Sequence, residues 1–226
     1  INTYTHADDM DKYSVKLEMK AKALYENRDK ALNLMKEILL TSDFTDTKRL
    51  HEIIAEAKSR MQASMTGAGH SLAAIRAMAG FSPTAAVSEQ LNGIPQYRLL
   101  EELDSDFENK KEELTRKLQN LITYIFRPEN LLVDYTGTEE GLIGIEEQMV
   151  LLKTELFTDE VSGAGFVPAR KVSKEGYMTA GQIQYVCRAG NYIKKGLPYT
   201  GALKVLKVMM GYEYLWNQVR VKGGAY

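Results

Sequence analysis

The side chains best suited to metal or nucleophilic chemistry are three histidines and one cysteine. His51 and Glu52 begin the pattern HExxA, which lacks the second histidine of the HExxH zinc motif, and the inverted motif HxxEH does not occur. His6 and His70 lie at no metal-ligand spacing from His51. Cys187 has no recognisable partner residue, so we predict a buried structural thiol. The sequence therefore predicts no metal ligands and no complete active site in this chain.

The composition argues against several classes of partner. The 226 residues carry a formal net charge of −1, and the basic residues are spread along the chain. We therefore expect no nucleic-acid binding and no polybasic membrane contact. No apolar run approaches the roughly 20 residues that span a bilayer. A single cysteine forms no internal disulfide, so nothing indicates an oxidising compartment. We expect a cytoplasmic or organelle-matrix protein.

The elements that would position a site begin with one long alternating segment. Apolar and polar residues alternate over 13–23, which predicts a strand with one buried face in an antiparallel sheet. Residues 131–135 predict a short buried strand. This combination with helices predicts an α+β fold, in which an antiparallel-type sheet is packed by several helices. Apolar spacings of three and four, with end signals such as Ser82-Pro83, predict helices at about 27–39, 50–65, 82–93, 106–125 and 139–156.

A stretch rich in glycine, alanine, serine and threonine at 63–80 interrupts the helical pattern. Gly67 and Gly69 would each cost about 1 kcal/mol relative to alanine inside a helix. A helix there requires compensation, for example close packing against another segment. The alternatives are such packing, which we favour, and a hinge.

The last third of the chain has a different organisation. Residues 158–181 are rich in turn formers and predict a linker. Beyond them, 182–189 predict a strand and 200–221 predict a helix. A strand and a helix alone cannot bury enough apolar surface to be stable. We therefore predict a helix-rich α+β domain at 1–157 and a truncated second domain of the same kind at 182–226.

Three segments of the second domain carry the most specific signal: YVCRAGNY from 185, YTGALKVL from 199 and YLWNQVRVKGGAY from 214. The last combines the single tryptophan, one arginine and a Gly-Gly-Ala-Tyr ending at fixed spacing. These segments resemble the presequence-protease branch of the pitrilysin and insulin-degrading (inverzincin) zinc metallopeptidases. The resemblance extends over nearly the whole chain. It implies that 1–157 is that family's third domain and that 182–226 is the start of its fourth.

The resemblance also implies roles for the end of the chain. The family's R-x(5)-Y segment reaches the substrate beside the zinc ion, which implies substrate binding by Arg220 and a catalytic oxyanion hydrogen bond from Tyr226. Gly223 and Gly224 would let the backbone approach an extended peptide. The family binds zinc through HxxEH in another domain, so zinc is expected in the full-length enzyme and none in this chain.

The same resemblance implies the partners of the chain. They are peptide substrates, which the full-length endopeptidase would degrade in an unstructured state, and the zinc-bearing N-terminal half of the same polypeptide. By itself the chain is expected to be inactive.

Two other functions stay open at this point. One is a non-catalytic, peptide-binding partner subunit of a two-chain peptidase, which shares the fold. The other is an unrelated helical scaffold, which leaves the pattern from Arg220 to Tyr226 unexplained. Without the resemblance, Arg220 is simply a cation favoured at a helix C-terminus. We favour the protease because an oxyanion donor has little purpose away from a zinc ion.

Overall fold

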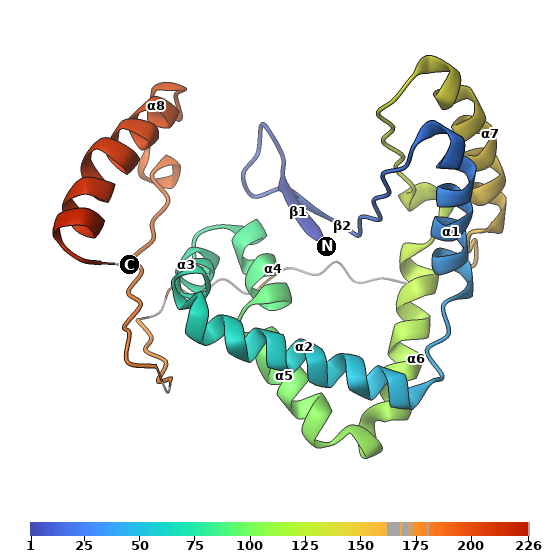
Figure 1. Ribbon diagram of the computed structural model, residues 1–226, viewed down its shortest axis with the longest axis horizontal. Helices are drawn as coiled ribbons and strands as arrows, with labels where there is room; N and C mark the ends of the chain where they lie inside the picture. The colour runs from blue at the N-terminus through green and yellow to red at the C-terminus, as the bar shows by residue number, and fades with distance from the viewer. Residues whose placement is uncertain (162–167, 169–171, 173, 180, 226) are drawn as a thin grey trace. The chain divides into compact units, whose positions relative to one another are not determined.

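A computed structural model describes residues 1–161, 168, 172, 174–179 and 181–225. The chain divides into two compact units, Ile1–Arg188 and Ala189–Tyr226. The first unit is mostly helical and begins with one small antiparallel sheet (Figure 1). The predicted domain limits at 157 and 182 stay a prediction.

The sheet is a hairpin of β1 (Asn2–Thr5) and β2 (Tyr13–Lys16), paired in the register Thr3 with Val15. Two threonines of β1 fasten the hairpin to a helix. The Thr3 hydroxyl lies 3.2 Å from that of Ser88, and the Thr5 hydroxyl lies 3.3 Å from that of Thr84. The hairpin is therefore held on α4 by polar contacts rather than by a buried apolar face.

The helices of the first unit begin at residues that suit helix starts. The Asp46 carboxylate accepts a hydrogen bond from the Arg49 N–H at 2.9 Å, and Ser82 caps a helix whose first residue is Pro83. The helices are α1 (Arg28–Thr41), α2 (Thr47–Gly67), α3 (Gly69–Ala79), α4 (Pro83–Asn92), α5 (Ile94–Ser105), α6 (Phe107–Ile125) and α7 (Glu139–Glu155), with 3-10 turns at Tyr25–Asn27 and Pro128–Asn130.

The core of this unit forms where α2, α5 and α6 meet. Ile54, Leu100 and Phe107 are buried there, one from each helix. Partly buried apolar side chains surround them: Leu50, Ala57, Met61, Leu103 and Leu114. These residues recur at helical spacing, so the predicted helices at 50–65 and 106–125 are confirmed. Their apolar faces are buried only in part, because Ile53 and Leu121 are exposed.

The strand predicted at 13–23 is confirmed only over Tyr13–Lys16, and the strands predicted at 131–135 and 182–189 are wrong in this structure. Residues 17–23, 131–135 and 182–189 carry no regular secondary structure. A strand needs a neighbour to satisfy its backbone N–H and C=O groups, and no strand pairs with these segments within the described residues. Leu132 is accordingly 78% exposed. The buried thiol predicted for Cys187 is also wrong, since that side chain is exposed.

One helix was not predicted at all. Residues 94–105 form α5, although Gly93-Ile94-Pro95 is typical of the end of a preceding helix. Gly93 does end α4, and Pro95 then lies in the first turn of α5, where its missing N–H is not needed. The same three residues therefore stop one helix and start the next.

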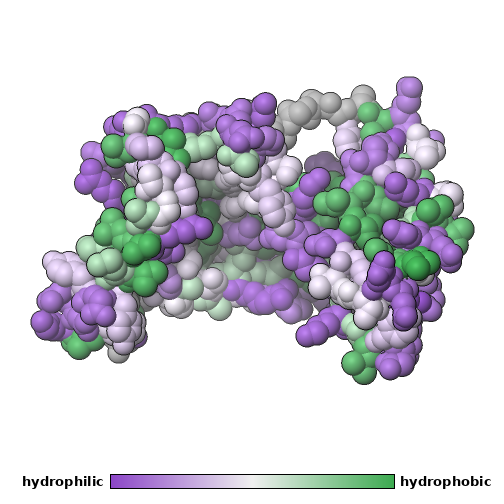
Figure 2. Space-filling view, turned by 90° about the horizontal axis from the view of Figure 1, so that it is seen from above, coloured by the Kyte–Doolittle hydropathy of each residue, from purple (hydrophilic) through white to green (hydrophobic). Residues whose placement is uncertain are grey.

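The second unit, Ala189–Tyr226, contains a 3-10 turn at Ile193–Lys195 and one continuous helical segment. That segment is α8 (Ala202–Met209) followed directly by η4 (Met210–Lys222), which is π-helical. The predicted helix at 200–221 is thus confirmed, with a change of helix type halfway. Apolar side chains lie on its surface, for example Val208 at 71% and Tyr212 at 67% exposure, and Figure 2 shows such apolar patches on one face of the molecule.

Candidate functional site

Arg220 lies in the last turn of η4, where its guanidinium packs on a tryptophan. The Arg220 Cζ atom is 4.8 Å from the centre of the Trp216 ring, a distance at which a cation is attracted to the ring face. Arg220 is exposed. Trp216 and Arg220 are four residues apart, which is less than one turn of a π-helix, so their side chains can meet.

The two glycines after η4 form the turn that ends the helix. Gly224 has φ +68, the left-handed conformation that glycine adopts at helix C-termini. The Gly224 N–H donates to the Arg220 carbonyl at 3.0 Å, and the Ala225 N–H donates to the Val219 carbonyl at 3.1 Å. A Cβ on Gly223 would lie 2.5 Å from that same Val219 oxygen. The glycines therefore have a local structural role in addition to the predicted one.

The structure brings three of the four predicted site residues together. Arg220, Gly223 and Gly224 form one helix end, with the guanidinium held on Trp216 beside a sharp backbone turn. Tyr226, the predicted oxyanion donor, lies outside the described residues. What the described arrangement offers chemically is a cationic hydrogen-bond donor at a turn that needs glycine.

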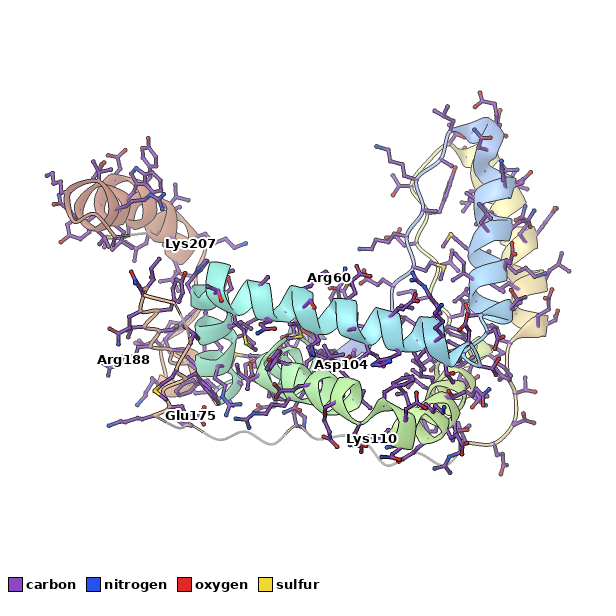
Figure 3. All side chains as sticks on the ribbon, turned by 60° about the horizontal axis from the view of Figure 1, so that its bottom comes forward. Arg60, Asp104, Lys110, Glu175, Arg188 and Lys207 are labelled. Carbon is purple, nitrogen blue, oxygen red and sulfur yellow. The ribbon has the colours of Figure 1, made fainter. Side chains whose placement is uncertain are left out.

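A second cluster of polar side chains lies between α2 and α5. His51 Nε2 is 3.1 Å from Asp104 Oδ1, and Lys58 makes an ion pair with the same carboxylate. The His51 ring stacks on Phe107 at 4.2 Å, with the planes nearly parallel. Lys58, which hydrogen-bonds the carboxylate, lowers the pKa of Asp104. Figure 3 labels Asp104 on α5.

This cluster borders a shallow pocket of about 430 Å³. The groups with chemical potential there already bond one another, because His51 and Lys58 share the Asp104 carboxylate. We therefore interpret the cluster as a structural link between α2 and α5. The pocket is lined by Thr47, Lys48, His51, Glu52, Ala55, Asp104, Phe107 and Glu108.

Glu89 on α4 is a buried carboxylate that no sequence pattern revealed. It is 2% exposed, and its Oε1 accepts a hydrogen bond from Arg76 Nη1 at 3.2 Å. Its Oε2 has no hydrogen-bond partner among the described residues. Burial raises the pKa of Glu89 above its ordinary value, and Arg76 opposes that shift. A single buried glutamate in a helix of mixed composition has no distinguishing spacing in the sequence.

The raised pKa of Glu89 predicts a pH effect on stability. Because its folded-state pKa exceeds its ordinary value of 4.5, the folded protein binds a proton more tightly than the unfolded chain. The free energy of unfolding of the wild type should therefore fall relative to that of Glu89→Gln as pH rises from 4.5 through the folded-state pKa. Urea denaturation at several pH values measures it. Glu112→Gln, which changes an exposed glutamate, is the control. If the free energies of unfolding of the wild type and Glu89→Gln change in parallel with pH, the prediction is contradicted.

The described residues do not fit a zinc ion. Among them, no group of three histidine, cysteine, aspartate or glutamate side chains is arranged to hold a metal. His51 lies within hydrogen-bond distance of one carboxylate, that of Asp104, and its ring stacks on Phe107. Within the same part of the chain, no helix is both long enough and apolar enough to cross a bilayer.

Two family models match the chain. One describes a region associated with the peptidases of family M16, subfamily C, and covers residues 1–103. The other, described as "PreP C-terminal domain", covers residues 174–226. The second match includes Arg220 and both glycines of the turn.

Several curated proteins are similar to the chain. The protein HypA of Clostridium perfringens is 34% identical over 93% of the chain and 21% of its own length. Presequence protease 1, chloroplastic/mitochondrial, of Arabidopsis thaliana is 26% identical over 93% of the chain and 20% of its own length. The mitochondrial presequence protease of Saccharomyces cerevisiae is 26% identical over 90% and 22%. The chain thus spans about a fifth of the length of these relatives.

Proposed function

We propose a substrate-binding role for this chain, which belongs to the presequence-protease branch of the M16 peptidase family. The chain corresponds to part of a zinc endopeptidase that degrades unstructured peptides. It supplies substrate binding and oxyanion stabilisation, whereas the zinc ion is bound by residues of the full-length polypeptide that are not in this chain. The observation that supports this function best is the helix end at Arg220, where an exposed guanidinium packs on Trp216 beside the Gly223-Gly224 turn.

The chemistry follows from the side chains at that helix end. A guanidinium forms charge-assisted hydrogen bonds to the carbonyl oxygens of an extended peptide. Packing on Trp216 restricts the rotamers of Arg220 before the peptide arrives, so less conformational entropy is lost on binding. The Tyr226 hydroxyl would donate a hydrogen bond to the negative oxygen that develops on the scissile carbonyl.

The remaining parts of the proposal concern the full-length protein. The β1–β2 hairpin would belong to a larger antiparallel-type sheet packed by the helices, and 182–226 would begin a second domain of the same kind. The apolar side chains exposed on α8 and η4, such as Val208 and Tyr212, then have a surface to pack against in the rest of the polypeptide, including its zinc-bearing half. The relatives' names place them in mitochondria or chloroplasts, so we propose an organelle-matrix or cytoplasmic location.

The single tryptophan gives a direct test of peptide binding by this chain. Titration with a tryptophan-free unstructured peptide should change the fluorescence of Trp216. The variant Arg220→Ala should bind about 10- to 100-fold more weakly, because a hydrogen bond to a charged group contributes about 1.5–3 kcal/mol. Lys207→Ala, which removes an exposed cation of α8, is the matched control. Equal affinities of the wild type and Arg220→Ala would refute the proposed role of Arg220.

The same protein sample tests whether peptide binding and zinc-dependent hydrolysis reside in different parts of the polypeptide. With zinc added, the chain should bind peptide without hydrolysing it. Zinc-dependent hydrolysis by the isolated 226 residues would contradict the proposal that the zinc ligands lie outside this chain.

A further inference from the structure

Residues 174–179 and 181–185, which we call the strap, attach to the helices of the first unit at two points. The first is an ion pair. Arg76 of α3 donates from Nε and Nη2 to the two carboxylate oxygens of Glu175, at 2.8 and 2.9 Å. Tyr177 donates its hydroxyl to the same carboxylate at 3.0 Å. Figure 3 labels Glu175 beside α3.

Arg76 is itself anchored to the helical part of the unit. Its third donor, Nη1, bonds the buried Glu89 of α4 at 3.2 Å. The hydrogen bonds to Glu175 are the main cause of the raised pKa of Arg76, so the guanidinium stays charged. The planar group thus connects a buried carboxylate on one side with the strap carboxylate on the other, in the bidentate geometry that arginine favours.

The second attachment is at the break between α2 and α3. Ala68 leaves helical geometry there, with φ −134 and ψ 35, and the Thr66 carbonyl at the end of α2 accepts a hydrogen bond from the Tyr185 hydroxyl at 3.1 Å. The Tyr185 ring covers Gly69, where an added Cβ would lie 2.7 Å from the ring atom Cε2. This contact accounts for Gly69, which makes room for a side chain of the strap, whereas a Cβ on Gly67 would meet nothing within 4 Å.

We propose that the strap is a latch. It holds the start of the region matched by the second family model, residues 174–226, on α2 and α3. It can open because neither attachment is buried. Opening frees the chain that runs from Tyr185 through Arg188 into the second unit. The latch is independent of peptide binding at Arg220.

Each attachment contributes modestly and separately to the equilibrium between the attached and the open strap. The side chains of Arg76 and Glu175 are 34% and 30% exposed, so solvent screens the ion pair. Loss of either attachment should shift the equilibrium toward the open strap by about fivefold, which corresponds to about 1 kcal/mol. Loss of both should shift it by about 25-fold if the two attachments act independently.

The single cysteine reports on the latch, because Cys187 is exposed and lies two residues beyond Tyr185. A nitroxide attached to Cys187 should show restricted motion in the wild type by electron paramagnetic resonance. Glu175→Ala and Tyr185→Ala should each increase the mobile fraction, and the double variant should increase it most. Gly69→Leu should reproduce Tyr185→Ala, because it fills the space of the ring.

Controls separate release of the strap from unfolding. Lys174→Ala changes an exposed neighbour of Glu175 and should leave the spectrum unchanged. Circular dichroism should show the same helix content in all variants, and trypsin should cut after Arg188 faster in the double variant. A label that is equally mobile in the wild type and the double variant would overturn the proposal. A label whose motion is restricted in both the wild type and the double variant would also overturn the proposal.

Discussion

Replacing Tyr226 with phenylalanine in the full-length enzyme is expected to lower kcat by about 10²–10³-fold. The change removes one hydroxyl and keeps the ring. If that hydroxyl donates to the oxyanion only as charge develops, the loss falls on kcat and leaves KM nearly unchanged. Steady-state hydrolysis of a fluorogenic peptide measures both constants.

Tyr214→Phe is the matched control for this prediction. Tyr214 is an exposed tyrosine of η4, 55% accessible, and it belongs to the same C-terminal segment without a proposed contact to the substrate. Its variant should retain wild-type kcat and KM. If Tyr226→Phe and Tyr214→Phe have the same activity, Tyr226 does not stabilise the oxyanion.

Replacing Phe107 with alanine should destabilise the chain by about 3–5 kcal/mol. Phe107 is 4% exposed and contacts the core formed with Ile54 and Leu100, and its ring stacks on His51. Truncation removes the apolar surface and leaves a cavity at the junction of three helices. Since small domains have total stabilities of about 5–15 kcal/mol, this is a large fraction.

Urea denaturation followed by circular dichroism measures the loss. Phe107→Leu, which keeps most of the volume, should recover much of the stability, and this variant remains informative if Phe107→Ala does not fold. Leu121→Ala on α6 is the control, because Leu121 is 52% exposed and should cost little. Equal losses for Phe107→Ala and Leu121→Ala would show that Phe107 is not in the core.

The helices could be predicted from the sequence because their signals are local. Residues close in the chain produce both kinds of signal: the apolar spacing around Ile54 and Phe107, and the helix start at Ser82-Pro83. The strands could not be predicted in the same way. The alternation over 13–23 favours extended chain, but a strand also needs a partner, and β2 pairs only over Tyr13–Lys16.

The candidate site illustrates the same limit. The end of a helix at Gly223-Gly224 follows from glycine's preference for the left-handed conformation, whereas the assignment of Arg220 to a substrate depends on family resemblance. The contacts of the strap join residues far apart in the chain, from Arg76 to Glu175 and from Thr66 to Tyr185. No periodicity in the sequence encodes such pairs.

The central claim is that this chain supplies side chains to a zinc site bound elsewhere in the full-length polypeptide. The most direct test is an experimental structure of that polypeptide with zinc and a trapped peptide. We predict that Arg220 donates hydrogen bonds to a peptide carbonyl and that the Tyr226 hydroxyl lies within hydrogen-bond distance of the scissile carbonyl oxygen. A bound peptide that contacts the zinc site while Arg220 and Tyr226 face solvent or their own domain would contradict this account.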